Sequence, residues 1–231
     1  MKFITPMHRI TYLICALFLL ISGTGILKAQ NNEATLGLRA GHNTSFGGFA
    51  AVSAEARGMI DEKFIIHGGA QYNTIGKVAA EARPSYFHDF SWGRLSAEAI
   101  LSYTNFASIN SFAGGVGAGI SSKWVSARLG YYYHTFGGKG GQINEPFNIY
   151  YEFCASLLPM IDEWDLKLTI TNNEIFELDR HYQPSFSALC SYYPTTNIGV
   201  HMGIGCKPSG MFHLSADYYE SYLKLGVCYR W

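Results

Sequence analysis

The chain has 231 residues, with 17 Lys and Arg against 17 Asp and Glu, and therefore no formal net charge. Charged residues make up 15% of the chain and aromatic residues another 15%. This length fits one domain. The balanced charge and the lack of a basic cluster exclude a nucleic-acid-binding protein, which needs a basic surface for phosphates.

The first 29 residues have the features of a secretory signal peptide. A positively charged start precedes the apolar run from Ile10 to Ile21, and the small residue Ala29 lies at the expected cut. An anchor helix would need about 20 apolar residues, which is longer than this run. We expect residues 1–29 to be removed and residues 30–231 to form one mature domain. Because the removed part carries three basic residues and no acidic one, the mature chain keeps 14 basic against 17 acidic residues.

After the signal peptide, apolar and polar residues alternate in runs separated by turn sequences. A period of two is the pattern of strands with one apolar face. No later apolar run has the length of a membrane-spanning helix, so a membrane location would require strands. Such runs cover residues 35–41, 50–57, 64–73, 77–83, 95–104, 112–120, 125–134, 149–157, 164–171, 197–205, 212–218 and 222–231.

These runs predict an all-β chain of about 12 strands, with 10 and 14 as neighbouring counts, because bacterial single-chain barrels normally have even numbers. Residues 172–187 are either one long loop or an additional strand. The segment "GGKGGQINEP", residues 137–146, is expected to be the longest flexible loop.

Two all-β architectures share this alternation: a soluble sandwich or barrel with the apolar face inward, and a transmembrane barrel with it outward. A soluble surface usually contains about 25–35% charged residues, which is more than this chain supplies. The polar face is instead rich in Gly, Ser, Thr and His. Many aromatic residues fall at the ends of the runs, as in the aromatic belts of transmembrane barrels. The pattern favours a closed antiparallel transmembrane β-barrel.

The chain ends on a strand in which every second residue is apolar and the last residue is aromatic. This ending resembles the C-terminal signal of bacterial outer-membrane β-barrel proteins. The resemblance implies delivery to the barrel-assembly machinery, contact with outer-membrane lipid, and a location in the outer membrane of a Gram-negative bacterium. The sequence "KAQ" at residues 28–30 resembles exported proteins of Bacteroidetes-type bacteria. The residues that carry the terminal pattern are Leu223, Leu225, Val227, Tyr229 and Trp231.

The predicted inner face collects charges of both signs. Such residues tune ion or solute selectivity if the lumen is open, but ion pairs and large side chains can also fill a small barrel. The first hypothesis is therefore a small passive channel for ions or small polar solutes. The alternative is a non-conducting structural or docking barrel with cell-envelope protein partners. The candidate lumen residues are Arg39, Glu55, Arg57, Lys77, Glu81, Arg83, Glu98, Arg128, Glu152, Asp165, Lys167, Asp217, Lys224 and Arg230.

One string could carry enzyme chemistry. His213, Ser215 and Asp217 share one strand face, and the His-x-Ser spacing resembles outer-membrane phospholipases and lipid A deacylases. In those families the pair faces lipid. Here the residues that alternate with the pair are apolar, so they would face lipid and the pair would face the lumen. A lipid hydrolase is therefore a remote alternative, and we expect no catalytic residue.

The remaining motifs predict no cofactor and no metal. The glycine string "GGVGAG" is followed by no helix, so it lacks the setting of a phosphate loop. On a strand, these glycines either keep the lumen open or let another side chain approach. The mature chain has four cysteines without metal-type spacing, and their pairing is left open. They are Cys154, Cys190, Cys206 and Cys228.

Overall fold

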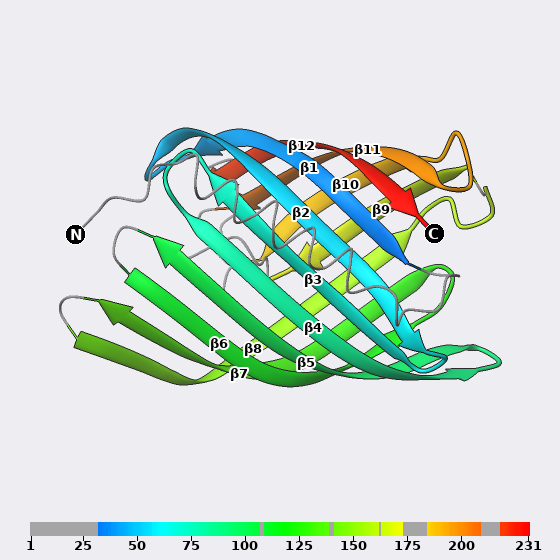
Figure 1. The fold of residues 1–231 in the computed structure, drawn as a ribbon, viewed down its shortest axis with the longest axis horizontal. Helices are drawn as coiled ribbons and strands as arrows, with labels where there is room; N and C mark the ends of the chain where they lie inside the picture. The colour runs from blue at the N-terminus through cyan, green and yellow to red at the C-terminus, as the bar shows by residue number, and fades with distance from the viewer. Residues whose placement is uncertain (1–31, 107–108, 139–140, 162, 173–183, 209–217) are drawn as a thin grey trace.

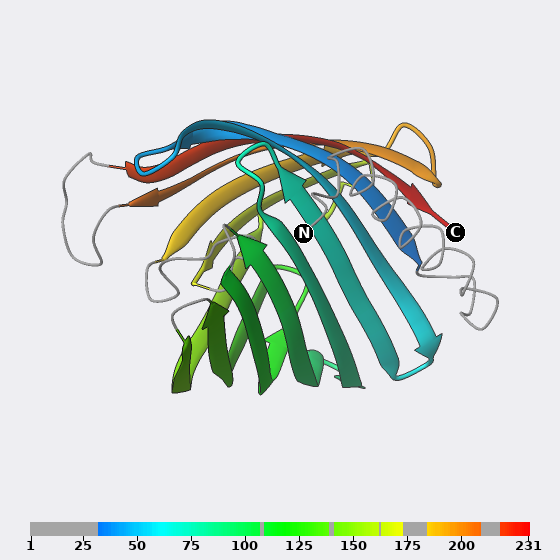
Figure 2. The same ribbon diagram turned by 60° about the vertical axis from the view of Figure 1, so that its left-hand side comes forward.

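The chain folds as a closed antiparallel barrel of 12 strands. The computed structural model describes residues 32–106, 109–138, 141–161, 163–172, 184–208 and 218–231. Each strand pairs with its neighbours in the sequence, and β1 closes the barrel against β12. Figures 1 and 2 show the tilted strands curving into one wall, with β1 beside β12. Closure pairs every strand on both sides and leaves no open sheet edge.

Most strands have 10 to 16 residues, and only β9 and β10 have 8. A tilted strand needs about 9–11 residues to cross a bilayer. The strands are β1 Glu33–Asn43, β2 Gly47–Asp61, β3 Phe64–Asn73, β4 Val78–Phe90, β5 Gly93–Phe106, β6 Ile109–Ser121, β7 Val125–Gly138, β8 Gly141–Ser156, β9 Trp164–Thr171, β10 Ser185–Tyr192, β11 Ile198–Pro208 and β12 Tyr218–Arg230.

The closing seam runs to the last residue of the chain. Leu38 of β1 lies opposite Leu225 of β12, and the same register continues to Glu33 and Arg230. Beyond the strands, the backbone N–H of Trp231 donates to the carbonyl of Asn32 at 3.1 Å. The terminal tryptophan is therefore part of the closed wall.

The outer face is apolar and the inner face is largely polar. The outward side chains of Leu38 and Leu101 are 61% and 59% exposed, whereas the inward Arg39 and Glu98 are 6% and 5% exposed. Exposed aromatic rings lie near both ends of the barrel. Near the chain termini they are Tyr86, Phe90, Trp92, Trp124, Trp164, Tyr192 and Tyr229, and toward the other end they are Phe46, Phe112, Tyr131, Tyr133 and Phe147. An apolar band between two aromatic girdles is the surface that transmembrane barrels present to lipid.

The two ends differ in their longest connections. Both ends have short turns: residues 62–63, 91–92 and 122–124 at the end that carries both described termini, and residues 44–46 and 74–77 among those at the opposite end. The opposite end has the two longest connections, between β9 and β10 and between β11 and β12. Figure 1 shows the β2–β3 turn on the same side as the C-terminus, and the β7–β8 hairpin on the other side.

The predicted strand number is confirmed, but two strand assignments change. Ser185–Tyr192 forms β10. No predicted strand covers these residues, and the undecided segment 172–187 includes only the first three residues of β10. Residues 212–218 were expected to form a strand of their own. Residues 212–217 lie outside the described residues, and Tyr218 already belongs to β12. The predicted turn at residues 219–221 is paired strand, because Glu220 lies opposite both Asn43 and Lys207.

The predicted loop at residues 137–146 is also wrong. Gly138 and Gly141 face each other at the end of the β7–β8 ladder, which continues through Thr135 and Asn144. Gly141 has a φ of 123°, which a residue with a side chain rarely adopts. The Thr135 hydroxyl donates to the Asn144 side-chain oxygen at 2.9 Å. The two strands of this hairpin therefore continue as far as Gly138 and Gly141, and residues 139–140 lie outside the described residues. The expected signal peptide, residues 1–29, lies outside the described residues.

Candidate functional site

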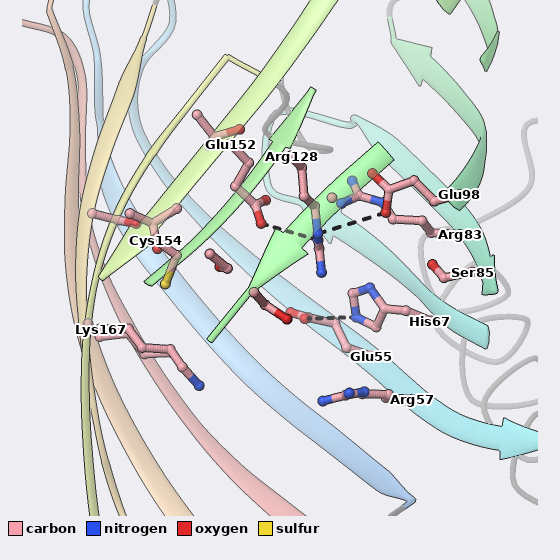
Figure 3. Close-up of a pocket in the computed structure, with 18 of the residues that line it drawn as sticks. Glu55, Arg57, His67, Arg83, Ser85, Glu98, Arg128, Glu152, Cys154 and Lys167 are labelled. Carbon is pink, nitrogen blue, oxygen red and sulfur yellow. Dashed lines mark ion pairs between the residues drawn. The ribbon is translucent and has the colours of Figure 1, made fainter. Parts of the chain in front are cut away.

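The barrel encloses a cavity of about 580 Å³. Each of the 12 strands contributes at least one residue to its wall. Figure 3 shows the charged side chains entering the cavity from different parts of the wall, with Arg128 near the centre of the view. Alternation with a period of two is the cause, because it turns every second residue of each strand inward.

The structure brings most of the predicted lumen residues together. Arg39, Glu55, Arg57, Arg83, Glu98, Arg128, Glu152, Lys167 and Lys224 line the cavity. Lys77 and Glu81 are buried away from it, at 6% exposure each. Arg230 lies near the chain termini, where its Nε donates to Glu33 at 2.7 Å. Asp217 lies outside the described residues.

Two groups of ion pairs cross the cavity wall. Arg128 of β7 lies between two carboxylates, 3.8 Å from Glu98 of β5 and 3.2 Å from Glu152 of β8. On the other side, Lys224 of β12 donates to Glu55 of β2 at 2.9 Å. His67 of β3 lies 3.9 Å from the same Glu55 carboxylate.

The cavity wall is richer in cations than in anions. Seven described basic residues line it: Arg39, Arg57, Arg83, Arg94, Arg128, Lys167 and Lys224. Three described acidic residues do so: Glu55, Glu98 and Glu152. Four of the basic residues pair with carboxylates that are not part of the wall, namely Glu220, Glu81, Asp89 and Asp165. The basic groups therefore border the cavity while several of their partners lie outside its wall.

Arg57 differs from the other basic residues of the wall. Within the described part of the chain, Arg57 makes no contact ion pair. Lys167 contacts Asp165, two residues earlier on the same strand, at 2.5 Å, and its side chain remains 44% exposed. Figure 3 shows both side chains entering the cavity.

A layer of large side chains fills part of the lumen beside the cavity. Ile100, Tyr132 and Tyr150 form a buried cluster on β5, β7 and β8, which we call the tyrosine layer. The Tyr150 hydroxyl donates to Glu98 at 2.8 Å. Its ring occupies the space that a Cβ atom would need at Gly117 and Gly130. The glycine string thus lets another side chain approach, which is one of the two alternatives left open by the sequence.

The sequence pattern predicted neither the tyrosine layer nor Arg94 as part of the lumen. The signal was present for the layer, because Ile100 and Tyr150 each lie two residues from a predicted lumen carboxylate, Glu98 and Glu152. Large apolar residues at inward positions were simply not expected in a polar face. Arg94 is the second residue of β5, and the predicted strand began one residue later.

At the edge of the cavity, Arg39 is held by several partners. Its guanidinium pairs with Glu220, which also accepts from the Asn43 side chain at 3.0 Å. The guanidinium carbon lies 3.5 Å from the ring centroid of Tyr222 and 5.7 Å from that of Phe49. This cluster joins β1, β2 and β12 at the closing seam.

Near the chain termini, one tyrosine outside the strands is half-buried against this end of the barrel. Burial, together with the Glu33 carboxylate, raises the pKa of Tyr193 to about 12. Its ring lies 3.7 Å from the Arg230 guanidinium carbon and covers Gly199. The phenol therefore stays protonated at neutral pH.

The other sequence motifs add no reactive group among the described residues. Cys154, Cys190, Cys206 and Cys228 are free thiols. No group of three His, Cys, Asp or Glu side chains in the described ranges is placed to hold a metal ion. The string from His213 to Asp217 lies outside the described residues. In the part of the chain that the structure describes, no helix is long and apolar enough to cross a membrane.

Solved structures of outer-membrane barrels resemble this chain. A KdgM porin in complex with disordered oligogalacturonate is 12% identical, with a TM-score of 0.53 over 85% of this chain and 99% of that one. The translocator domain of the autotransporter NalP from Neisseria meningitidis is 10% identical, with a TM-score of 0.56 over 96% of each chain. An outer membrane channel from Pseudomonas putida F1 is 8% identical, with a TM-score of 0.54 over 89% of this chain and 97% of that one.

At these identities the likeness shows the fold alone: this chain has the closed β-barrel fold of outer-membrane proteins. No family model matches the chain, and no curated protein matches it. Function must therefore be argued from the cavity.

Proposed function

We propose that the protein is an outer-membrane β-barrel that forms a small passive channel for ions or small polar solutes. The observation that carries this proposal is the charged cavity, which all 12 strands line inside a closed barrel. The apolar outer face and the two aromatic girdles suit a bilayer. A polar lumen inside an apolar wall is what lets a barrel pass hydrated solutes across lipid.

The proposal includes an orientation and a route of assembly. Short turns face the periplasm and longer loops face outward in outer-membrane barrels, so the chain termini belong on the periplasmic side. The row Leu223, Leu225, Val227 and Tyr229 faces outward on the closing strand, at 44–54% exposure. Together with Trp231 it is available to the barrel-assembly machinery after removal of the signal peptide. The Bacteroidetes-type origin stays a prediction.

Single-channel recording tests the proposal. The protein refolded in detergent is added to a planar lipid bilayer, and a shift in gel mobility between unboiled and boiled samples first establishes that the barrel is folded. Discrete, reproducible current steps are expected. A folded barrel that gives no current at any salt concentration would contradict the channel.

The tyrosine layer favours a second candidate, a non-conducting barrel that docks envelope proteins. Ile100, Tyr132 and Tyr150 are 1–4% exposed and occupy lumen space on β5, β7 and β8. If this layer closes the passage, the folded protein stays silent in the bilayer. Co-purification of the same envelope protein with the unmodified barrel would then support the docking function.

A further inference from the structure

We propose that the cavity is a binding site for one small oxyanionic solute, a sugar-sized molecule that carries a carboxylate or phosphate group. Arg57 holds the negative group, with Arg128 and Lys167 lining the same cavity, and the channel prefers anions over cations. The inference deepens the proposed channel function, but binding itself does not require conduction.

The arrangement of charge in the wall is the first argument. The described wall contains seven basic and three acidic side chains. Four of the basic groups pair with carboxylates that do not line the cavity, so among the described residues seven basic groups stand against seven acidic groups once these partners are counted. Attraction of an anion therefore depends on a basic group whose charge no neighbour matches by contact, and a narrow lumen with low-dielectric walls strengthens the field of such a group.

Arg57 supplies the second argument, because its charge is not compensated by contact. Glu33 attracts the guanidinium, but this carboxylate already accepts a hydrogen bond from Arg230 at 2.7 Å. Arg94 and Arg128 act on Arg57 with like charge. An oxyanion between these groups would relieve that repulsion. Arginine is the suitable residue, since its planar guanidinium binds carboxylate and phosphate through two parallel hydrogen bonds.

Arg128 and Lys167 line the same cavity from other strands, but carboxylates already match their charges. Arg128 lies 3.2 Å from Glu152 and 3.8 Å from Glu98. Lys167 lies 2.5 Å from Asp165, and its side chain is 44% exposed. Figure 3 shows Arg57, Arg128 and Lys167 entering one cavity from β2, β7 and β9. A solute bound at Arg57 therefore lies in the same cavity as both of these groups.

The rest of the wall suits a polar body attached to the anionic group. Several hydroxyl groups line the same cavity, among them those of Ser53, Ser85, Ser96, Ser126, Thr169 and Ser187. Hydroxyls donate and accept hydrogen bonds, as a sugar does. A cavity of about 580 Å³ lies within the range of small-molecule sites. The match is to a hydroxylated solute of sugar size rather than to a bare ion or an apolar acid.

The test compares four hexoses that share one ring. Calorimetry of the folded protein in detergent measures binding of glucose, glucosamine, glucuronate and glucose 6-phosphate. Glucuronate or glucose 6-phosphate is expected to bind at least about tenfold more tightly than glucose, the ratio expected for one charge-assisted hydrogen bond. The tighter of the two identifies the group as carboxylate or phosphate. Equal binding of all four, or tightest binding of glucosamine, would overturn the proposal.

Variants locate the site. Arg57→Gln is expected to weaken binding of the anionic hexose about tenfold, whereas Arg57→Lys should retain most of it. Lys167→Gln should weaken binding less, because the Lys167 ammonium is already paired with Asp165. Lys123→Gln is the matched control, because this exposed residue lies in the turn between β6 and β7, outside the cavity. A loss in Lys123→Gln equal to that in Arg57→Gln would contradict the site. Gel mobility of unboiled protein verifies folding of each variant.

Conduction is measured separately, so that the two proposals can fail independently. In a potassium chloride gradient, the reversal potential of the unmodified channel should show chloride preference, reduced in Arg57→Gln. A channel that conducts with potassium preference overturns the anion site and leaves the channel intact. A silent barrel that binds glucuronate through Arg57 supports the site and overturns the channel.

Discussion

The cavity and the tyrosine layer lie on the same strands, yet one is open and the other is filled. On β8, the side chain of Glu152 is 26% exposed and lines the cavity, whereas Tyr150, two residues away, is 1% exposed. On β5, Glu98 borders the cavity and Ile100, again two residues away, is packed against Tyr132 and Tyr150. All of these side chains point inward.

The difference teaches that alternation decides which side chains face the lumen, but not whether the lumen is open there. The size of each inward side chain, and the room that residues of the neighbouring strands leave for it, decide whether the lumen is open at that point. Gly117 and Gly130 leave room for the Tyr150 ring to lie over the wall of β6 and β7. Where the neighbouring residues are charged, as at Arg128, the side chains repel or pair without filling the space.

Removing the tyrosine layer is the change with the largest expected effect. In the double variant Tyr132→Ala/Tyr150→Ala, the packed layer becomes continuous with the cavity, and single-channel conductance should rise several-fold. Loss of each ring should also lower the free energy of unfolding by about 3–5 kcal/mol. Tyr131→Ala is the control, because this ring faces outward at 49% exposure. Unchanged conductance in the double variant would mean that the layer does not limit the passage.

The second largest effect is expected at the closing seam. Arg39→Leu leaves the Glu220 carboxylate buried, with the Asn43 side-chain amide still donating to it at 3.0 Å. Removing one member of a buried ion pair costs about 3–5 kcal/mol. Urea unfolding in detergent should show this loss, and Arg39→Lys should restore part of it. An unchanged unfolding midpoint would show that Glu220 finds another partner.

A smaller effect tests the glycine positions beneath Tyr150. In Gly117→Val, the new side chain overlaps the Tyr150 ring and hydroxyl, so the ring must move. Overpacking of this kind costs about 1–3 kcal/mol. Gly114→Val on the same strand is the matched control, because a Cβ atom there meets Leu101 at an ordinary 3.7 Å. Equal unfolding free energies for the two variants would contradict the packing of Tyr150 over Gly117.

The sequence predicted the barrel because alternation is a local property that survives along the whole chain. Leu36 and Leu38 indicate β1 even when the strand that pairs with it is not known. The sequence failed where length or pairing decided the structure. β10 is only eight residues long and follows a segment with no clear period, and the β7–β8 hairpin extends through glycines that look like a loop.

The candidate site was predictable as a set of inward charges, but not as a pattern of pairs. The balance of basic and acidic residues in the sequence gives no hint of which charges pair. Asp165 lies two residues from Lys167 on β9, whereas Glu220 reaches Arg39 only through the register between β1 and β12. The filling of the lumen by Tyr150 likewise depends on two glycines on other strands.

The smallest change in stability is expected within the cavity itself, at the pair Lys224–Glu55. Their side chains are 25% and 24% exposed, so the pair contributes at most about 1 kcal/mol to the free energy of unfolding. Lys224→Gln should therefore unfold at nearly the same urea concentration as the unmodified protein. It leaves Glu55 facing the cavity with His67 at 3.9 Å, which should reduce anion preference in the reversal potential.

The reciprocal variant Glu55→Gln frees the Lys224 ammonium and should increase anion preference. Opposite shifts of the reversal potential, at nearly constant stability, are expected because both groups line the open cavity rather than the packed layer. Shifts of the same sign in both variants would mean that the pair acts through the shape of the wall instead of its charge. A loss of stability comparable to that of Arg39→Leu would show that this side of the lumen is packed as tightly as the tyrosine layer.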